Sequence, residues 1–199
     1  MTTKEVYEEC NEFHKGKLDV DRFTLINLDT QQGKMFSLTA FKLHHDKECV
    51  GYMICCVATG DTYVHFADNG GIMDKDLYSL LGDKEYYSIE SNYDVELTYF
   101  SNRDSILKKR CLGYYGHSSN LQAIENVIKL VGEHTECVQF NHLSEETNSE
   151  ELATKWHMEH LIIWNKLDLT KNIKFSYAKQ NEIVPMDNGK THKEIRGVR

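Results

Sequence analysis

The segment 110-RCLGYYGHSSN-120 decides how the second half of the chain folds. A basic run at 108–110 leads into two glycines, a histidine and two serines. Apolar side chains then recur at helical spacing, at Leu121, Ile124, Val127, Ile128 and Val131. The segment therefore predicts a loop that opens a helix over 118–131, with Ser118 or Ser119 as its N-cap.

The composition of this loop allows two interpretations. A helix N-terminus offers unpaired backbone N–H groups and a partial positive charge, both of which favour an anion. Gly113 and Gly116 would let the backbone approach a ligand, and Arg110 carries a planar fork that matches phosphate oxygens. Ser118 and Ser119 add donors. The alternative is a glycine turn with a serine cap and solvated lysines.

The length and composition indicate an ordinary globular protein. The 199 residues suit one domain or at most two small ones, with 40% hydrophobic and 27% charged residues. The polar start predicts no secretory signal, and no apolar run reaches the about 20 residues that a membrane span needs. The six cysteines are scattered without a CxxC pair, which favours reduced thiols over a thiolate zinc site. We therefore expect a cytoplasmic protein without membrane contact.

The net charge of −8 bears on the choice of partner. Binding of long nucleic acid needs clustered Lys and Arg, so an acidic chain argues against it. A local basic patch could still hold one small anion, and the acidity would suit a basic protein partner.

The remaining pattern predicts a mixed fold. Apolar or alternating runs predict strands at 22–28, 35–43, 49–59, 62–67, 94–100, 137–143, 162–169 and 173–178. Helical spacing predicts further helices at 3–14, 74–82 and 145–161. The polar turn at 44–48 predicts a hairpin. We expect an α+β or α/β fold with a mixed, mostly antiparallel central sheet flanked by helices. Residues 1–178 would form one globular domain, and 179–199 a C-terminal tail.

This element order, together with Arg-x-x-Gly at 110-RCLG-113, resembles the GCN5-related N-acetyltransferase superfamily. Gly116 follows three residues after Gly113, one more than in the family pattern. The resemblance implies that the loop holds the pyrophosphate of acetyl-CoA, through Arg110, Gly113, Gly116, Ser118 and Ser119.

The resemblance also implies an activity, the transfer of an acetyl or other acyl group from acyl-CoA to an unknown amine. Glu96, on the strand expected at 94–100, would be the base. Tyr114, Tyr115 or His117, beside the cofactor loop, would be the acid. The implied cofactor is acetyl-CoA, and no metal is expected.

Three alternatives remain open beside the acyltransferase. The first is a non-catalytic acidic interaction protein, of the inhibitor, immunity or viral accessory type, that binds a basic partner. The second is a metal site on 157-HMEH-160 or on the pair His44 and His45, where histidines lie close in sequence. The third follows from the spacing of Arg110 and His117, which resembles that of HEPN ribonucleases.

Overall fold

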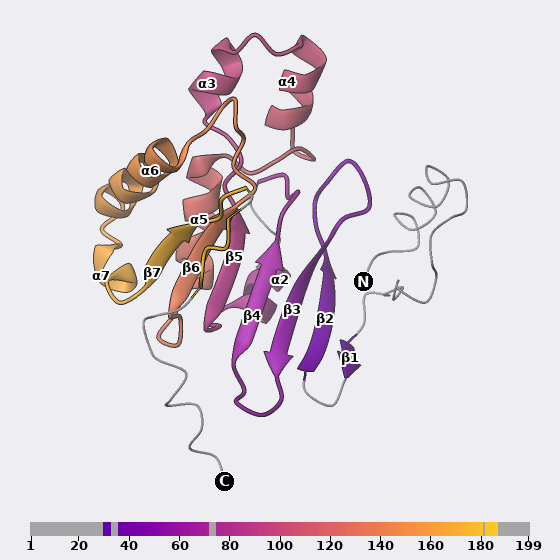
Figure 1. Ribbon diagram of the computed structural model, residues 1–199, viewed down its shortest axis with the longest axis vertical. Coiled ribbons are helices and arrows are strands. Elements are labelled where there is room, and N and C mark those ends of the chain that lie inside the picture. Colours follow the sequence, from indigo (N-terminus) through magenta and orange to yellow (C-terminus); the bar gives the residue numbers. More distant parts are fainter. Residues whose placement is uncertain (1–29, 33–35, 72–74, 181, 187–199) are drawn as a thin grey trace, which may run out of the picture.

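The computed structural model describes residues 30–32, 36–71, 75–180 and 182–186 (Figure 1). The helix predicted at 3–14 and the strand predicted at 22–28 lie outside these residues. The division into a domain at 1–178 and a tail at 179–199 stays a prediction.

In the described part of the chain, seven strands form one sheet in sequence order. They are β1 (Thr30–Gln32), β2 (Phe36–Lys42), β3 (Val50–Cys56), β4 (Thr62–Phe66), β5 (Tyr86–Glu90), β6 (Cys137–Asn141) and β7 (Lys174–Tyr177). The pairings from β1 to β4 are antiparallel, and those from β4 to β7 are parallel. The predicted mixed sheet and the hairpin at 44–48 are thereby confirmed.

Helices connect the parallel strands, as such pairs need a crossover. They are α2 (Lys75–Leu81), α3 (Val95–Phe100), α4 (Ser105–Leu112), α5 (Asn120–Leu130), α6 (Glu150–Ile163) and α7 (Leu167–Thr170). Figure 1 shows α3 and α4 standing beyond the end of the sheet at which β5 terminates. The predicted helix after the glycine loop is confirmed as α5.

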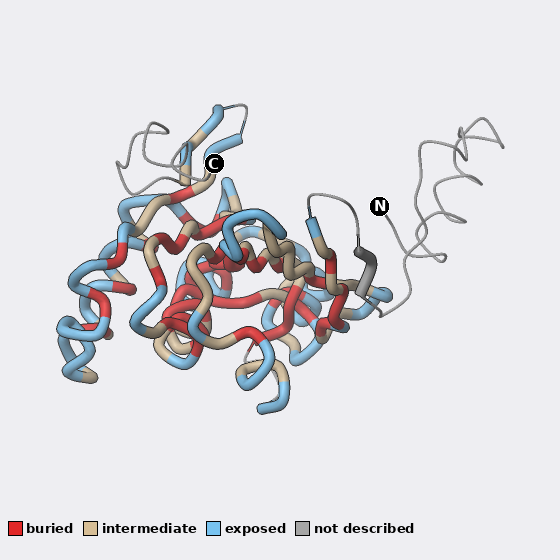
Figure 2. The backbone as a smooth tube through the Cα atoms, turned by 90° about the horizontal axis from the view of Figure 1, so that it is seen from below, coloured by how far each residue is buried: buried red, intermediate tan, exposed pale blue. Residues whose placement is uncertain are grey.

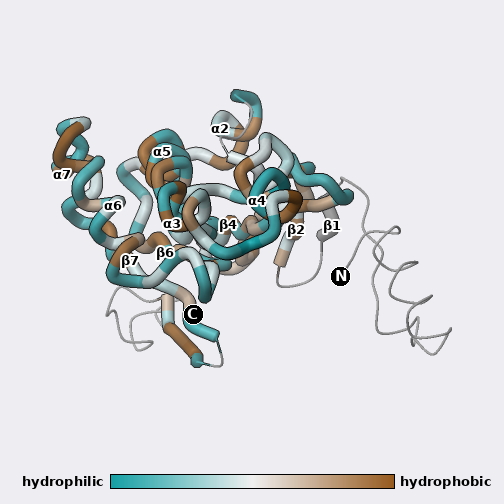
Figure 3. The backbone as a smooth tube through the Cα atoms, turned by 90° about the horizontal axis from the view of Figure 1, so that it is seen from above, coloured by the Kyte–Doolittle hydropathy of each residue, from teal (hydrophilic) through white to brown (hydrophobic). Residues whose placement is uncertain are grey.

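The main core lies between the sheet and the helices α2, α5 and α6. Its buried side chains include Val64, Phe66, Leu81, Tyr87, Ile89, Ile124, Val127, Leu130, Val138, Phe140, Ala153 and Leu161. Buried residues, red in Figure 2, gather in the middle of the molecule, and apolar residues of α5 are brown in Figure 3. The hydroxyl of Tyr87 donates to the carbonyl of Leu81 at 2.7 Å, which satisfies the polar end of this ring within the core.

The strand predicted at 94–100 is wrong, because this segment forms α3. Asp94 caps the helix, and its carboxylate accepts from the backbone N–H of Leu97 at 2.7 Å. The aromatic and branched residues that suggested a strand lie on an exposed helix, with Phe100 73% exposed. Local composition therefore misled here, since a cap decided the backbone conformation.

The strand predicted at 162–169 is also wrong. Helix α6 continues through the apolar pair Ile162 and Ile163, which are 59% and 70% exposed. Asn165 then takes a left-handed conformation with φ of 53°, and the short helix α7 follows. The apolar run is thus an exposed helix end.

Among the described residues, no helix is both long and apolar enough to cross a membrane. None of the five cysteines described there forms a disulfide.

Candidate metal centre

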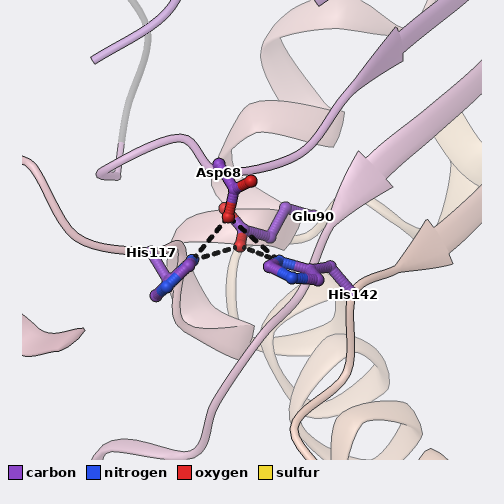
Figure 4. Close-up of side chains that lie close together, drawn as sticks. All are labelled: Asp68, Glu90, His117 and His142. Carbon is purple, nitrogen blue, oxygen red and sulfur yellow. Dashed lines mark hydrogen bonds and ion pairs between the residues drawn. The ribbon is translucent and has the colours of Figure 1, made fainter. Parts of the chain in front are cut away.

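Four polar side chains meet where three parallel strands end. Asp68 follows β4 by two residues, Glu90 is the last residue of β5, and His142 comes directly after β6. Because the carboxyl ends of parallel strands lie at one edge of a sheet, these residues are neighbours in space. His117 joins them from the loop between α4 and α5 (Figure 4). We call Asp68, Glu90, His117 and His142 the ligand cluster.

The two histidines point at one oxygen. Nδ1 of His117 lies 2.8 Å from Oε1 of Glu90, and Nδ1 of His142 lies 2.7 Å from the same atom (Figure 4). Oδ1 of Asp68 is 3.4 Å from Nδ1 of His117 and 3.6 Å from Nδ1 of His142. One potential ligand atom from each of the four residues therefore lies within 4.8 Å of the others.

The backbone holds two of these residues in an uncommon conformation. Asp68 and His142 have φ of 54° and 56°, in the left-handed region that residues other than glycine seldom adopt. The side-chain amide of Asn92 donates to the carbonyl of His142 at 2.7 Å, which fixes that turn. Such conformations cost free energy and gather at functional sites.

Glu90 is fully buried yet ionised. Its other oxygen, Oε2, accepts from the backbone N–H groups of Asn69 at 2.8 Å and Ser118 at 3.2 Å. Burial opposes ionisation, but the hydrogen bonds from His117 and His142 outweigh it and hold the pKa of Glu90 below its ordinary value. The hydrogen bond to Glu90 in turn raises the pKa of His142.

The chemistry of this donor set fits a divalent metal ion. Two imidazole nitrogens and two carboxylates are the ligand types of zinc and of related borderline cations. Hard oxygen-only ions such as calcium suit the cluster less well, because half of its donors are nitrogens.

The ligand cluster opens on a pocket of about 790 Å³. Asp68, His117 and His142 line it, together with two arginines, Arg103 and Arg110. A negatively charged substrate in this pocket would therefore meet both the cluster and two fixed cations.

Several backbone N–H groups of the loop at 110–120 already have partners within the protein. That of Gly116 donates to the carbonyl of Gly113 at 2.9 Å, and that of His117 donates to the carbonyl of Cys111 at 3.2 Å. The N–H of Ser118 reaches Glu90, and that of Ser119 reaches the side chain of Gln122 at 2.9 Å. The anion site predicted at this helix start is therefore occupied by the protein's own groups.

Close packing of the backbone explains Gly116 without a ligand. A Cβ atom at this position would lie 2.2 Å from the carbonyl oxygen of Arg110 and 2.3 Å from that of Cys111. Gly113 is the C-cap of α4. Both glycines thus serve the turn between α4 and α5.

The predicted site residues lie in several places. Glu96 is exposed on α3, and Tyr114 is 63% exposed, with its ring 5.2 Å from that of His44. Ser119 caps α5, and the hydroxyl of Ser118 donates to the carbonyl of Asn69 at 2.7 Å.

From the predicted set, Arg110 and His117 both line the pocket. Arg110 pairs with the carboxylate of Asp46, and His117 belongs to the ligand cluster.

The histidines of 157-HMEH-160 have other partners. His157 is buried, with Nε2 3.2 Å from the hydroxyl of Ser91 and Nδ1 3.0 Å from that of Tyr177. Nδ1 of His160 bonds to the carbonyl of Trp156 at 2.9 Å. These bonds account for both side chains without a metal.

Sequence reasoning missed Asp68, Glu90 and His142 as a group. Asp68 lies directly after the strand predicted at 62–67, and Glu90 lies between the helix predicted at 74–82 and the strand predicted at 94–100. The available signal was a polar residue at the end of each of three strands. It becomes informative once the strands are taken as parallel.

Comparisons with known proteins agree with this geometry. No family model matches the sequence. Exodeoxyribonuclease WalJ of Streptococcus pneumoniae is 34% identical over 92 residues, which are 46% of this chain and 34% of that protein. The metallo-β-lactamase fold protein YhfI of Bacillus subtilis superposes with a TM-score of 0.54 at 14% identity, covering 86% of this chain and 59% of that one. The chain has the metallo-β-lactamase fold.

A second solved structure of similar shape is the short form of human tRNase Z, with a TM-score of 0.53 at 13% identity. The match covers 92% of this chain and 64% of that one. The match to WalJ spans about a third of the length of that protein. The matches to YhfI and to tRNase Z each span less than two thirds of those chains.

The metallo-β-lactamase fold corrects the functional predictions. The N-acetyltransferase resemblance is wrong, and with it the predicted acyl-CoA-dependent N-acyltransferase that uses acetyl-CoA. Residues 94–100, the strand of the acyltransferase interpretation, form a helix, and β6 pairs with β5 instead. The expectation of no metal is contradicted by the fold and by the ligand cluster.

The predicted partners are also wrong. They were an acyl-CoA with an amine acceptor or, for a non-catalytic protein, a basic partner, and long nucleic acid was excluded. Likeness to an exodeoxyribonuclease and to a tRNase contradicts all three statements. Arg103 and Arg110 both line the pocket, although the chain has a net charge of −8.

Proposed function

We propose that the chain forms the metal-binding part of a metal-dependent phosphodiesterase that acts on nucleic acid. The observation that carries this proposal is the ligand cluster at one wall of a pocket that also holds Arg103 and Arg110. The sequence similarity to an exodeoxyribonuclease supports the choice of nucleic acid.

The ligand cluster would hold the cation, and the chain's own groups would position the reaction. A divalent cation bound there would polarise a phosphoryl oxygen and an attacking water. Glu90 holds both imidazole rings through Oε1, so the rings already lie at the cluster without an ion.

The pocket arginines would compensate the charge of the substrate. Guanidinium groups bind phosphate oxygens through paired N–H donors and stay charged at any physiological pH. Arg103 and Arg110 would therefore hold the phosphodiester beside the ligand cluster and offset the charge that grows during cleavage.

Metal affinity tests the proposal most simply. Protein stripped with a chelator should bind Zn²⁺ or Mn²⁺ in calorimetric titration. His117→Gln and His142→Gln should each weaken the affinity by at least about ten- to a hundred-fold, since even groups behind the ligands contribute that much. Chelator-sensitive cleavage of an oligonucleotide should be lost in the same variants.

A matched control is His134→Gln. His134 is an exposed histidine that pairs with Asp83 away from the pocket, at 2.8 Å. This variant should bind the cation like the wild type. Unchanged affinity in both His117→Gln and His142→Gln would refute the proposal.

A further inference from the structure

Helix α4 and the turn before it line one wall of the pocket. Leu107, Arg110 and Cys111 line it from one face of α4, at the spacing of neighbours on a helix surface. Arg103 lines it from the turn that precedes the N-cap Asp104.

Each arginine is held by a different segment of the chain. The guanidinium of Arg110 pairs with the carboxylate of Asp46, with Nη2 3.1 Å from Oδ1. The guanidinium of Arg103 donates to Oε2 of Glu146 at 2.6 Å and to the hydroxyl of Ser144 at 2.8 Å. The guanidinium of Arg110 is thus bound to the segment between β2 and β3, and that of Arg103 to the segment after β6. In these positions each arginine would bind its own phosphate.

The acidic partners of these arginines are exchangeable. The side chain of Glu146 is 69% exposed and that of Asp46 is 35% exposed. Ion pairs at such positions are weak, because water and salt screen them. A phosphate could replace either carboxylate without leaving a buried charge unpaired.

Exposed aromatic pairs flank both ends of α4. Tyr99 and Phe100 precede it, 65% and 73% exposed, with ring centroids 5.1 Å apart. Tyr114 and Tyr115 follow it, 63% and 58% exposed, with ring centroids 5.0 Å apart. Unstacked bases of a single strand bind to exposed aromatic faces beside a basic track, whereas paired bases in a duplex do not offer theirs.

Two lysines continue the positive charge over the helix. Lys108 and Lys109 line a second pocket, of about 610 Å³, together with Tyr99. The basic residues of α4 thus extend from the ligand cluster towards one of the aromatic pairs.

We propose that α4 and its flanking aromatic pairs form a platform for single-stranded nucleic acid, on which Arg103 and Arg110 bind separate phosphates of one strand. This inference rests on the proposed function and specifies its substrate as a strand with several phosphates and unpaired bases. The strand crosses α4, and one of its phosphodiesters lies beside the ligand cluster.

Fluorescence anisotropy with a labelled 20-residue oligothymidylate tests the platform. The measurement is made in EDTA, so that it reports binding alone. The wild type should bind this strand more tightly than a duplex of the same length. Because each phosphate contact on a single strand adds about 0.7 to the salt slope, Arg103→Gln and Arg110→Gln should each lower that slope by about 0.7. At 0.1 M salt this corresponds to about five-fold weaker binding.

Variants of the acidic partners should change the affinity for the strand in the opposite direction. Asp46→Asn and Glu146→Gln release the arginines and should strengthen binding, an effect that loss of folding cannot imitate. Lys155→Gln, on α6, removes an exposed cation elsewhere and should change the salt slope less than either arginine variant. Replacing Tyr99 and Tyr115 by alanine should weaken binding of the strand without changing the salt slope.

Three results would overturn the platform. They are duplex bound as tightly as the single strand, no binding at low salt, or unchanged slopes in both arginine variants. Since EDTA removes the metal, a failure here leaves the calorimetric result untouched. Failure of metal binding with an intact oligonucleotide response would refute the proposed function alone.

Discussion

Glu90 is a fully buried carboxylate whose two oxygens serve different parts of the site. Oε1 holds the rings of His117 and His142, while Oε2 ties down the backbone at Asn69 and Ser118. A buried charge is costly unless it is fully bonded, and here both oxygens have two partners. One residue therefore fixes the positions of three loops around the pocket.

His157 gives a prediction at the scale of a residue. Burial lowers its pKa to about 3, below the unfolded value of 6.5. Between these values the unfolded chain binds more protons than the folded one. The contribution of neutral His157 to the free energy of unfolding should therefore be fully present above about pH 6.5. Below that pH it should decrease by about 1.4 kcal/mol per pH unit.

Urea unfolding of the chelated protein at pH 7.5, 6.0 and 5.0 measures this dependence. His157→Gln keeps a polar side chain but cannot take a proton, so its stability should depend less steeply on pH than that of the wild type. Parallel curves for the two proteins would show that His157 does not stay neutral in the fold.

Helix α5 shows what local sequence can predict about an element. Its apolar spacing and its serine cap were visible in the sequence, and the structure has a capping box between Ser119 and Gln122. Helix α3 was missed because its strand-forming residues are exposed and Asp94 caps them into a helix. Periodicity reports a buried face, so an exposed helix such as α3 leaves no such signal.

The cap of α5 should connect stability to the metal site. Ser119→Ala removes the capping bond and should lower the free energy of unfolding by about 1 kcal/mol. Because His117 lies two residues before this cap, the same variant should also weaken Zn²⁺ or Mn²⁺ binding in calorimetry.

Ser149→Ala is the matched variant, since Ser149 caps α6 with a bond to the N–H of Leu152 at 3.2 Å. It should cost similar stability and leave metal affinity unchanged. Equal effects of the two variants on metal binding would show that the α5 cap does not specifically support the metal site.

At the scale of the whole molecule, the site is a product of the parallel half of the sheet. Glu90 opposes Asn141, the residue before His142, and β4 ends beside β5. His142 and Asp68 are 52 and 22 positions from Glu90 in sequence, so neither spacing nor composition links the three residues. The sequence predicted a mixed sheet, but it placed strands at 94–100 and 162–169, where the structure has helix, and it did not give the strand directions. The parallel direction of β4, β5 and β6 brings Asp68, Glu90 and His142 together. His117 joins them from the loop before α5.

The central claim is that the ligand cluster binds a divalent cation. Anomalous X-ray scattering from crystals grown with Zn²⁺ or Mn²⁺, recorded on both sides of the metal's absorption edge, tests it most directly. We predict an anomalous peak among Asp68, Glu90, His117 and His142 that is absent from crystals of His142→Gln. A peak at another group of residues, or none at the cluster at saturating metal, would contradict the account.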